Sequence, residues 1–198
     1  MQKAKNEDVV ATVLSREKVG RYYRFYGARH SILQLGYLID FEIQEDHRAF
    51  LPRMRSLSHF AFPWIFDRER MMVWQRLMQQ LEIHLRETET VESFYFDALL
   101  KAAKKWHRQH PKRLAVEFYT AMLHDEGRLH PPTFCYVCEN AIGEETALMS
   151  GFKPAHPTCI YAPAVPTERI VSLFETQKTT LLDDNEVHLL YSVMTKAL

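Results

Sequence analysis

The stretch GYLIDFEI, residues 36–43, decides the class of the N-terminal fold because its apolar and polar side chains alternate. A period of two predicts a β-strand with one buried face. The side chains expected on that face are Tyr37, Ile39, Phe41 and Ile43. The first part of the chain is therefore expected to be built from strands.

Three further stretches near this strand have the residue types of strands. The β-branched run DVVATVL, residues 8–14, is expected to pair with GRYYRFYG, residues 20–27, which is flanked by glycines. RAFLPRMRSL, residues 48–57, is a fourth extended stretch, and Pro52 confines it to an edge or a bulge because proline has no N–H to donate. Short strands with turn signals over about 60 residues predict a small antiparallel barrel or sandwich.

From about Asp67 the apolar period changes from that of strands to that of helices, as in Trp74, Leu77, Met78, Leu81 and Leu85. Helices are expected at about 67–85, 91–106, 112–126, 167–177 and 183–196. Gly127 should end the third of these, and Thr167 and Asp183 are expected N-caps of the last two. The chain is therefore predicted to be α+β, with a β domain at residues 1–66 and an α-helical domain at residues 67–198.

The clearest motif lies in CYVCENAIGEETALMSGFKPAHPTCI, residues 135–160, which holds all three cysteines of the chain. Cys135 and Cys138 are separated by two residues, and after 17 intervening residues His156 and Cys159 are again separated by two. Two such pairs match the tetrahedral set of four ligands that Zn²⁺ prefers. The pattern favours a structural zinc site in an insert at about residues 133–161.

Three other interpretations of this segment are weaker. A redox-active CxxC normally lies at a helix N-terminus after a strand, whereas Cys135 follows HPPTF and precedes a turn. A catalytic zinc keeps an open coordination position, and four protein ligands leave none. The remaining alternative is that the cysteines are unrelated core residues.

The overall composition is that of a soluble globular protein without a membrane span, with 46% hydrophobic and 25% charged residues. The N-terminus lacks the apolar region of a secretory signal, and an odd number of cysteines fits no simple disulfide framework. We therefore expect the protein in the reducing cytoplasm, with no membrane partner.

The formal net charge is zero, but the charges are distributed in blocks. Residues 1–30 have seven bases and three acids, and residues 101–113 have six bases and no acid. The candidates for DNA contact in the first block are Arg16, Lys18, Arg21, Arg24, Arg29 and His30. They alternate with aromatic residues that could stack on bases, although only Tyr22 and Tyr26, or Tyr23 and Phe25, can face outward, and strand aromatics are more often core.

The second basic block is a candidate either for DNA or for an acidic protein tail, and consists of Lys101, Lys104, Lys105, Arg108, Lys112 and Arg113. A solvated helix face that suits the C-terminal helix dipole is the alternative. An acidic tail also needs an apolar pocket, which Trp106 and Phe118 could line. His107, His110, His124 and His130 do not have converging spacing and are taken as surface or capping residues.

The order of these segments resembles that of the RecO family of bacterial recombination mediators. "EDVVATVLSREKVGRYYRFYGARHS" and "LQLGYLIDFEI" are similar to the opening strands of that family, and "FLPRMRSLSHF" is similar to its closing barrel strands. "FCYVCEN" followed by "SGFKPAHPTC" is similar to the zinc-binding form of its helical domain, with a histidine as the third ligand. Only MQKAKN precedes Glu7, so the first barrel strand is expected to be missing or replaced.

The resemblance implies an OB-like barrel, a helical domain with structural Zn²⁺, and a non-enzymatic function. Proteins of this family bind single- and double-stranded DNA, anneal strands, contact the acidic C-terminal tail of single-strand-binding protein and act with RecR to load RecA. A nucleoid-associated cytoplasmic protein is implied.

Two other functional classes remain as alternatives to a DNA-binding mediator. A zinc-stabilised interaction adaptor that does not bind nucleic acid fits the zero net charge, although the two basic blocks oppose it. An enzyme such as a zinc-dependent nuclease is the weakest alternative, because the ligand set is complete and common catalytic motifs are absent.

Overall fold

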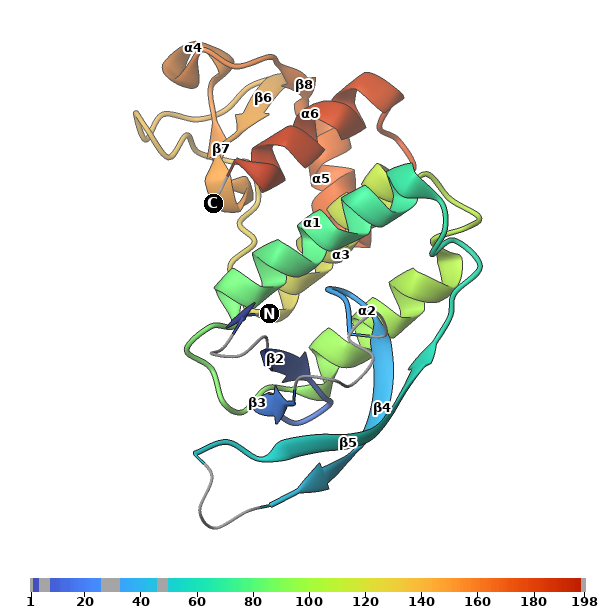
Figure 1. Ribbon diagram of the computed structural model, residues 1–198. Helices are drawn as coiled ribbons and strands as arrows, with labels where there is room; N and C mark the ends of the chain where they lie inside the picture. Colours follow the sequence, from blue (N-terminus) through green and yellow to red (C-terminus); the bar gives the residue numbers. More distant parts are fainter. Residues whose placement is uncertain (1, 4–7, 26–32, 46–49, 197–198) are drawn as a thin grey trace. The chain divides into compact units, whose positions relative to one another are not determined.

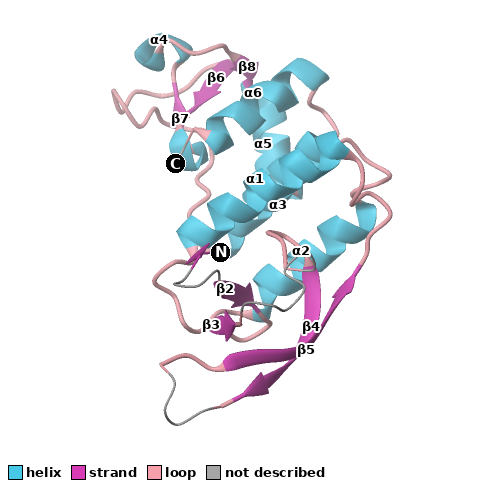
Figure 2. Cartoon of the chain, viewed as in Figure 1, coloured by secondary structure: helices cyan, strands magenta, loops and turns pink. Residues whose placement is uncertain are grey.

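The computed structural model describes residues 2–3, 8–25, 33–45 and 50–196 of the chain. It contains two compact units, Met1–His107 and Arg108–Leu198 (Figure 1). Strands precede helices in the first unit, and the second is mainly helical with a small sheet (Figure 2). The predicted α+β class is confirmed.

The first unit contains a sheet of five strands in the order β1-β2-β3-β5-β4. The strands are β1 (Gln2–Lys3), β2 (Val9–Leu14), β3 (Val19–Arg24), β4 (Leu38–Gln44) and β5 (Arg53–Phe60). β2 pairs antiparallel with β3 as predicted, and β4 pairs antiparallel with β5. β1 and β4 are the two edges and do not pair with each other in the described residues, so the expected barrel is not closed.

The first strand of the sheet is present, although short. β1 has two residues and pairs antiparallel with β2, with Gln2 opposite Val10. The segment before Glu7 therefore contributes only the two residues Gln2 and Lys3 to the sheet among the residues that the structure describes.

The inner face of this sheet forms a small apolar core. Its buried members are Val9, Ala11, Tyr22, Leu33 and Met54. Ile39 and Phe41 pack against them as predicted. Ile43 is 48% exposed, contrary to the prediction, because β4 is an edge strand with a neighbour on one side only.

Pro52 does not place β5 at an edge, because β5 lies between β3 and β4. Pro52 precedes the first residue of the strand, so its missing N–H costs no ladder hydrogen bond. Its carbonyl oxygen accepts a hydrogen bond from the Tyr23 N–H at 2.9 Å and so joins β5 to β3.

Two helices, α1 (Arg68–His84) and α2 (Ser93–Lys105), complete the first unit. The rings of Trp64, Trp74 and Trp106 pack against one another, with pairs of ring centroids 4.9 to 6.0 Å apart. The Trp64 indole N–H donates to the Ala103 carbonyl at 2.8 Å. The Trp106 indole N–H donates to the Arg70 carbonyl at 3.1 Å, and the Arg70 guanidinium donates to the Trp106 carbonyl. These contacts join the start of α1 to the end of α2.

An apolar cavity of about 210 Å³ lies in the same unit. Residues of β2, the segment 33–39, α1 and α2 line it, and α2 contributes Phe96, Leu99, Leu100 and Ala103. The segment enters it at Gly36, which has φ +84° and whose carbonyl accepts the Trp74 indole N–H at 2.8 Å. A Cβ at position 36 would lie 2.5 Å from the Trp74 indole nitrogen, so only glycine fits.

The second unit contains α3 (Pro111–Asp125), α5 (Thr167–Thr176) and α6 (Asp184–Thr195). α3 is followed by Gly127 at φ +66°, as predicted. Asp183 caps α6 as predicted, and Glu186 completes a reciprocal capping box. Thr167 is the first helical residue of α5 and not its cap, because its hydroxyl donates instead to the Gly143 carbonyl at 2.8 Å.

A small three-stranded sheet with the order β7-β6-β8 precedes α5. Its strands are β6 (Glu145–Leu148), β7 (Pro154–Ala155) and β8 (Val165–Pro166), and the short helix α4 (Pro157–Ile160) lies between the last two. Phe152 is 1% exposed and contacts Tyr119 of α3 and Phe174 of α5. The side chain of Phe152 thus anchors the segment between β6 and β7.

The change from strands to helices lies where the sequence predicts it, since β5 ends at Phe60 and α1 begins at Arg68. The boundary between domains at residues 66 and 67 stays a prediction. The compact units divide at residues 107 and 108, because α1 and α2 belong with the sheet. No helix in the described ranges combines the length and apolar character needed to cross a membrane.

Candidate metal centre and nucleic-acid surface

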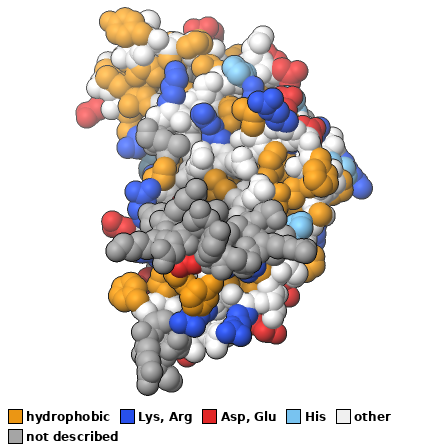
Figure 3. Space-filling model, in the orientation of Figure 1, with side chains coloured by type: hydrophobic (Ala, Val, Ile, Leu, Met, Phe, Trp, Pro, Cys, Tyr) orange, Lys and Arg blue, Asp and Glu red, His pale blue; other side chains and the backbone are white. Residues whose placement is uncertain are grey.

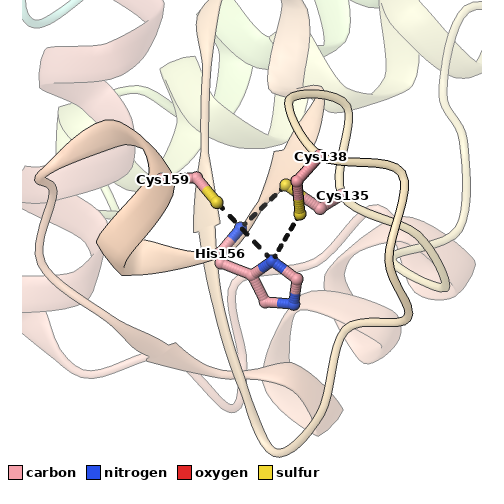
Figure 4. Close-up of side chains that lie close together, drawn as sticks. All are labelled: Cys135, Cys138, His156 and Cys159. Carbon is pink, nitrogen blue, oxygen red and sulfur yellow. Dashed lines mark hydrogen bonds between the residues drawn. The ribbon is translucent and has the colours of Figure 1, made fainter.

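The four predicted metal ligands lie together in the second unit (Figure 4). Cys135 and Cys138 come from the turn before β6, His156 precedes α4, and Cys159 lies within α4. Their ligand atoms all lie within 4.8 Å of one another. We call residues 133–161 the knuckle.

The spacing of these atoms fits a tetrahedral ion. With Zn–S and Zn–N distances of about 2.3 and 2.0 Å, tetrahedral ligand atoms lie about 3.5 to 3.8 Å apart. The Cys138 Sγ lies 3.3 Å from the His156 Nδ1, and the Cys159 Sγ lies 3.8 Å from the same atom. The four donors therefore suit a zinc-sized cation, which would join the two turns.

A hydrogen bond from Nε2 orients the imidazole of His156 so that Nδ1 can bind a metal. Nε2 lies 3.0 Å from the Ala141 carbonyl oxygen, to which it donates its proton. That tautomer leaves the lone pair of Nδ1 directed toward the sulfur atoms. This contact, first among several, raises the pKa of His156.

The Cys135 thiol is the buried member of the cluster, with 1% exposure. Its Sγ accepts the backbone N–H groups of Val137 at 3.4 Å and of His156 at 3.3 Å. Burial alone would raise the pKa of Cys135, but these donors and that of Cys138 outweigh it and lower the pKa to about 6. The backbone thus stabilises a thiolate, the form that binds a metal.

Burial, followed by hydrogen bonds to the neighbouring thiols, raises the pKa of Cys159 to about 11. Three free cysteines lie close together in this cluster. Such crowding is expected at a site where a bound cation balances the negative charge of the thiolates. All four coordination positions come from the chain, which is the pattern of a structural site. His107, His110, His124 and His130 are exposed, and no second group of metal-binding side chains is found in the described ranges.

The candidate DNA residues of the first block do not share one surface. Arg16, Lys18 and Arg21 are exposed, and Arg16 pairs with Asp97 at 3.0 Å. Arg24 lies beside Tyr22 on the inner face of β3 and is 8% exposed, which argues against a phosphate contact. Arg29 and His30 lie outside the described residues.

The structure adds two arginines that the sequence analysis missed, Arg53 and Arg55 of β5. Arg53 lies opposite Tyr23 in the sheet, and its guanidinium lies over the Phe25 ring, 4.6 Å from the centroid. Arg55 is exposed and has no ion-pair partner among the described residues. The alternation in RMRS could have predicted that both arginines lie on the face of the strand that points away from the buried Met54 side chain.

The outward side of β3 and β5 therefore carries a mixed basic and aromatic surface. We call it the β3–β5 face, and it consists of Arg21, Tyr23, Phe25, Arg53 and Arg55. Tyr23 packs edge-on against Phe25 at 5.1 Å, and its hydroxyl donates to the Asp8 carboxylate. This bond and burial raise the pKa of Tyr23. The Phe25 ring remains 47% exposed.

The second basic block is divided between the two units. Lys101, Lys104 and Lys105 are exposed on α2, and they have no ion-pair partner in the described chain. In the other unit, the Arg113 guanidinium donates to the carbonyls of Thr179 and Leu182 and pairs with Asp184, while Lys112 contacts His188. The guanidinium of Arg113 therefore stabilises contacts within the second unit.

Trp106 and Phe118 do not line an open pocket. Trp106 is 0% exposed within the tryptophan cluster, and Phe118 is 5% exposed on the inner side of α3. Both side chains are core residues, so the prediction that they line a pocket for an acidic tail is wrong. The apolar cavity in the first unit is lined by Phe96, Leu99 and Leu100 instead.

An N-terminal sheet of OB size, followed by helices and a four-donor knuckle, defines a small α+β protein with a candidate metal centre. The family model described as RecO N terminal matches residues 1–65. Residues 1–65 are therefore similar to the N-terminal domain of RecO-family proteins, in agreement with the resemblance seen in the sequence. A search of curated proteins found no match.

Proposed function

We propose that the protein is a non-enzymatic, RecO-like recombination mediator that binds and anneals single-stranded DNA. It would also bind double-stranded DNA, act with RecR and single-strand-binding protein, and help to load RecA in gap repair. The match of residues 1–65 to the RecO N-terminal family supports this class of function. We propose that Zn²⁺ fills the knuckle and has a structural role.

The observation that carries the proposal is the β3–β5 face. Arg21 and Arg55 are exposed and have no ion-pair partner in the described parts of the chain. The exposed ring of Phe25 contacts both the Tyr23 ring and the guanidinium of Arg53. Arginines that follow a phosphate backbone beside an aromatic ring that stacks on a base are the usual elements of single-strand binding.

The exposed lysines of α2 support a second contact, with the acidic tail of single-strand-binding protein. Lys101 and Lys104 lie on the same helix as Phe96, Leu99 and Leu100, which line the apolar cavity of the first unit. A tail with acidic residues and an apolar end would place its carboxylates on the lysines and its apolar side chain in the cavity. Charge reversal at Lys101, Lys104 and Lys105 should weaken binding of such a peptide.

The decisive experiment measures binding of fluorescent oligo-dT to wild type and to an Arg21→Glu, Arg55→Glu variant over a range of salt concentrations. Each lost phosphate contact on single-stranded DNA makes the salt slope shallower by about 0.7, so the double variant should lose about 1.4. Phe25→Ala should weaken binding at all salt concentrations, since stacking contributes about 1–3 kcal/mol per base.

Arg76→Glu is the matched control, because Arg76 is exposed on α1 and lies outside the β3–β5 face. Equal salt slopes for wild type and the double variant would refute the DNA surface. Oligo-dT binding that is absent in wild type, together with stable binding of a protein partner, would support the adaptor alternative. Strand annealing and RecA loading on coated DNA then test the finer function.

A further inference from the structure

The knuckle exposes an unusual share of the apolar side chains of the second unit. Among the described residues 108–196, five large hydrophobic side chains are exposed, and four belong to the knuckle: Phe134, Tyr136, Val137 and Tyr161. Their exposed fractions are 62%, 46%, 51% and 96%. Figure 3 shows hydrophobic side chains gathered over α4 and the adjoining loop, at the upper left of the view. Single exposed apolar residues are ordinary, but a group on one small motif marks an interaction surface.

The two turns that carry these side chains are held side by side. The Tyr136 N–H donates to the Pro154 carbonyl at 2.9 Å, and the Cys135 N–H donates to the Asn140 carbonyl at 2.9 Å. The contacts of His156 with Cys138 and Cys159 join the first turn to the turn that ends at Tyr161. The exposed rings therefore project from a fixed backbone, which lowers the entropy lost on binding.

The backbone of Tyr161 provides a separate observation. Tyr161 ends α4 in the left-handed conformation, with φ 52° and ψ 45°, where glycine or asparagine is favoured. Its ring has almost no packing to offset this strain, since it is 96% exposed. A strained residue with an unburied side chain is better explained by an external contact than by folding.

The charges around the rings indicate which kind of partner fits. The knuckle contains Glu139, Glu144 and Glu145 and a single base, Lys153. The three carboxylates are exposed and have no ion-pair partner among the described residues. Lys153 lies over the Tyr136 ring, with its Nζ 5.8 Å from the centroid. Unpaired acids on the same short segment as the exposed rings repel a nucleic acid backbone and attract a basic peptide.

We propose that the knuckle is a docking surface for a protein segment that combines apolar side chains with lysines or arginines. Apolar side chains of the partner pack on Phe134, Tyr136, Val137 and Tyr161, and its cations pair with Glu139, Glu144 and Glu145. This surface is separate from the β3–β5 face, which belongs to the other unit. It therefore does not depend on the proposed DNA binding.

The test uses the full chain to select binders from a phage-displayed library of random peptides. We expect the recovered sequences to combine aliphatic or aromatic residues with several lysines or arginines. Fluorescence anisotropy with one recovered peptide should show at least a tenfold rise in Kd for Tyr136→Ser and for Tyr161→Gly. A Glu144→Lys, Glu145→Lys variant should also bind more weakly, and the loss should shrink at high salt.

Leu181→Ser is the matched control, because Leu181 is 57% exposed in the same unit but outside the knuckle. Tyr161→Gly removes a left-handed tyrosine, so its melting temperature should not fall, and lost binding cannot then be ascribed to unfolding. Acidic selected peptides, no enriched peptide, or affinities unchanged in the tyrosine variants would overturn the proposal. So would a dependence of oligo-dT binding on Tyr136 and Tyr161 in place of peptide binding.

Discussion

Replacing Arg24 with methionine should make the first unit more stable. Arg24 is 8% exposed on the inner face of β3, and its Nε has no hydrogen-bond partner among the residues that the structure describes. Burial lowers the pKa of the guanidinium, which reflects the cost of holding a cation there. Met54, a buried apolar neighbour in the same core, indicates that an unbranched apolar chain suits these surroundings.

The size of the gain follows from the groups involved. An unsatisfied buried donor costs about 1–3 kcal/mol, and a methionine of similar length removes that donor without leaving a large cavity. Part of the gain is lost because the arginine chain already packs its methylene groups. We expect Arg24→Met to raise the free energy of unfolding by about 1–2 kcal/mol.

Urea denaturation followed by tryptophan fluorescence measures this change directly. All three tryptophans, Trp64, Trp74 and Trp106, lie in the first unit, so the signal reports on that unit. The midpoint should rise with an unchanged m value. Arg21→Met is the matched control on the exposed face of the same strand, and it should change stability by less than about 0.5 kcal/mol. A loss of more than about 1 kcal/mol in Arg24→Met would show that the guanidinium has a stabilising partner and that the reasoning is wrong.

Four further changes test the second unit. Arg113→Met should lower the free energy of unfolding by about 2–3 kcal/mol, because it removes the charged donors that bind the carbonyls of Thr179 and Leu182. Chemical denaturation measures this loss. A hydrogen bond and charge from Arg113 lower the pKa of Asp184, so the stabilisation from this pair is present above the unfolded-state pKa of 3.8 and is lost as pH falls through the lower folded-state pKa. The melting temperatures of wild type and Asp184→Asn should therefore converge in acid. Removing bound metal with a chelator should speed hydrogen exchange in β6 and β7. Tyr161→Gly should raise the free energy of unfolding by about 1 kcal/mol by relieving left-handed strain.

Each of these expectations has a clear contrary result. Unchanged stability in Arg113→Met would mean that water replaces the guanidinium at both carbonyls. A difference between wild type and Asp184→Asn that persists in acid would exclude the ion pair as its cause. Full protection of β6 and β7 without metal would refute the structural role of zinc. A less stable Tyr161→Gly variant would show that the tyrosine supports the fold.

The four residues of the candidate metal centre could be predicted from the sequence, because metal chemistry fixes both the residue types and their spacing. Two pairs of ligands, each separated by two residues, leave few arrangements other than two facing turns, and the structure brings those four side chains together. The Ala141 carbonyl that orients His156 could not be predicted, because any residue supplies a carbonyl.

The surfaces were harder to predict than the centre, because the alternation in β3 defines two faces without saying which one is buried. Packing against Val9, Ala11 and Met54 decides this, and it buries Tyr22 and Arg24 and leaves Tyr23 and Phe25 outside. Trp106 shows the same limit, since its burial depends on two tryptophans more than 30 residues away in the sequence. Residues distant in sequence decide which side of a regular pattern faces water.

The paired hydrogen bonds between Arg70 and Trp106 have a kinetic consequence. Each residue donates a side-chain hydrogen bond to the backbone carbonyl of the other. Two hydrogen bonds therefore connect the first turn of α1 to the residue that caps the C-terminus of α2. Helix ends normally fray first and exchange their amide hydrogens fastest. Here the end of α2 should exchange only when the start of α1 also opens. The two helices should therefore share one opening rate, although 36 positions separate these residues along the chain.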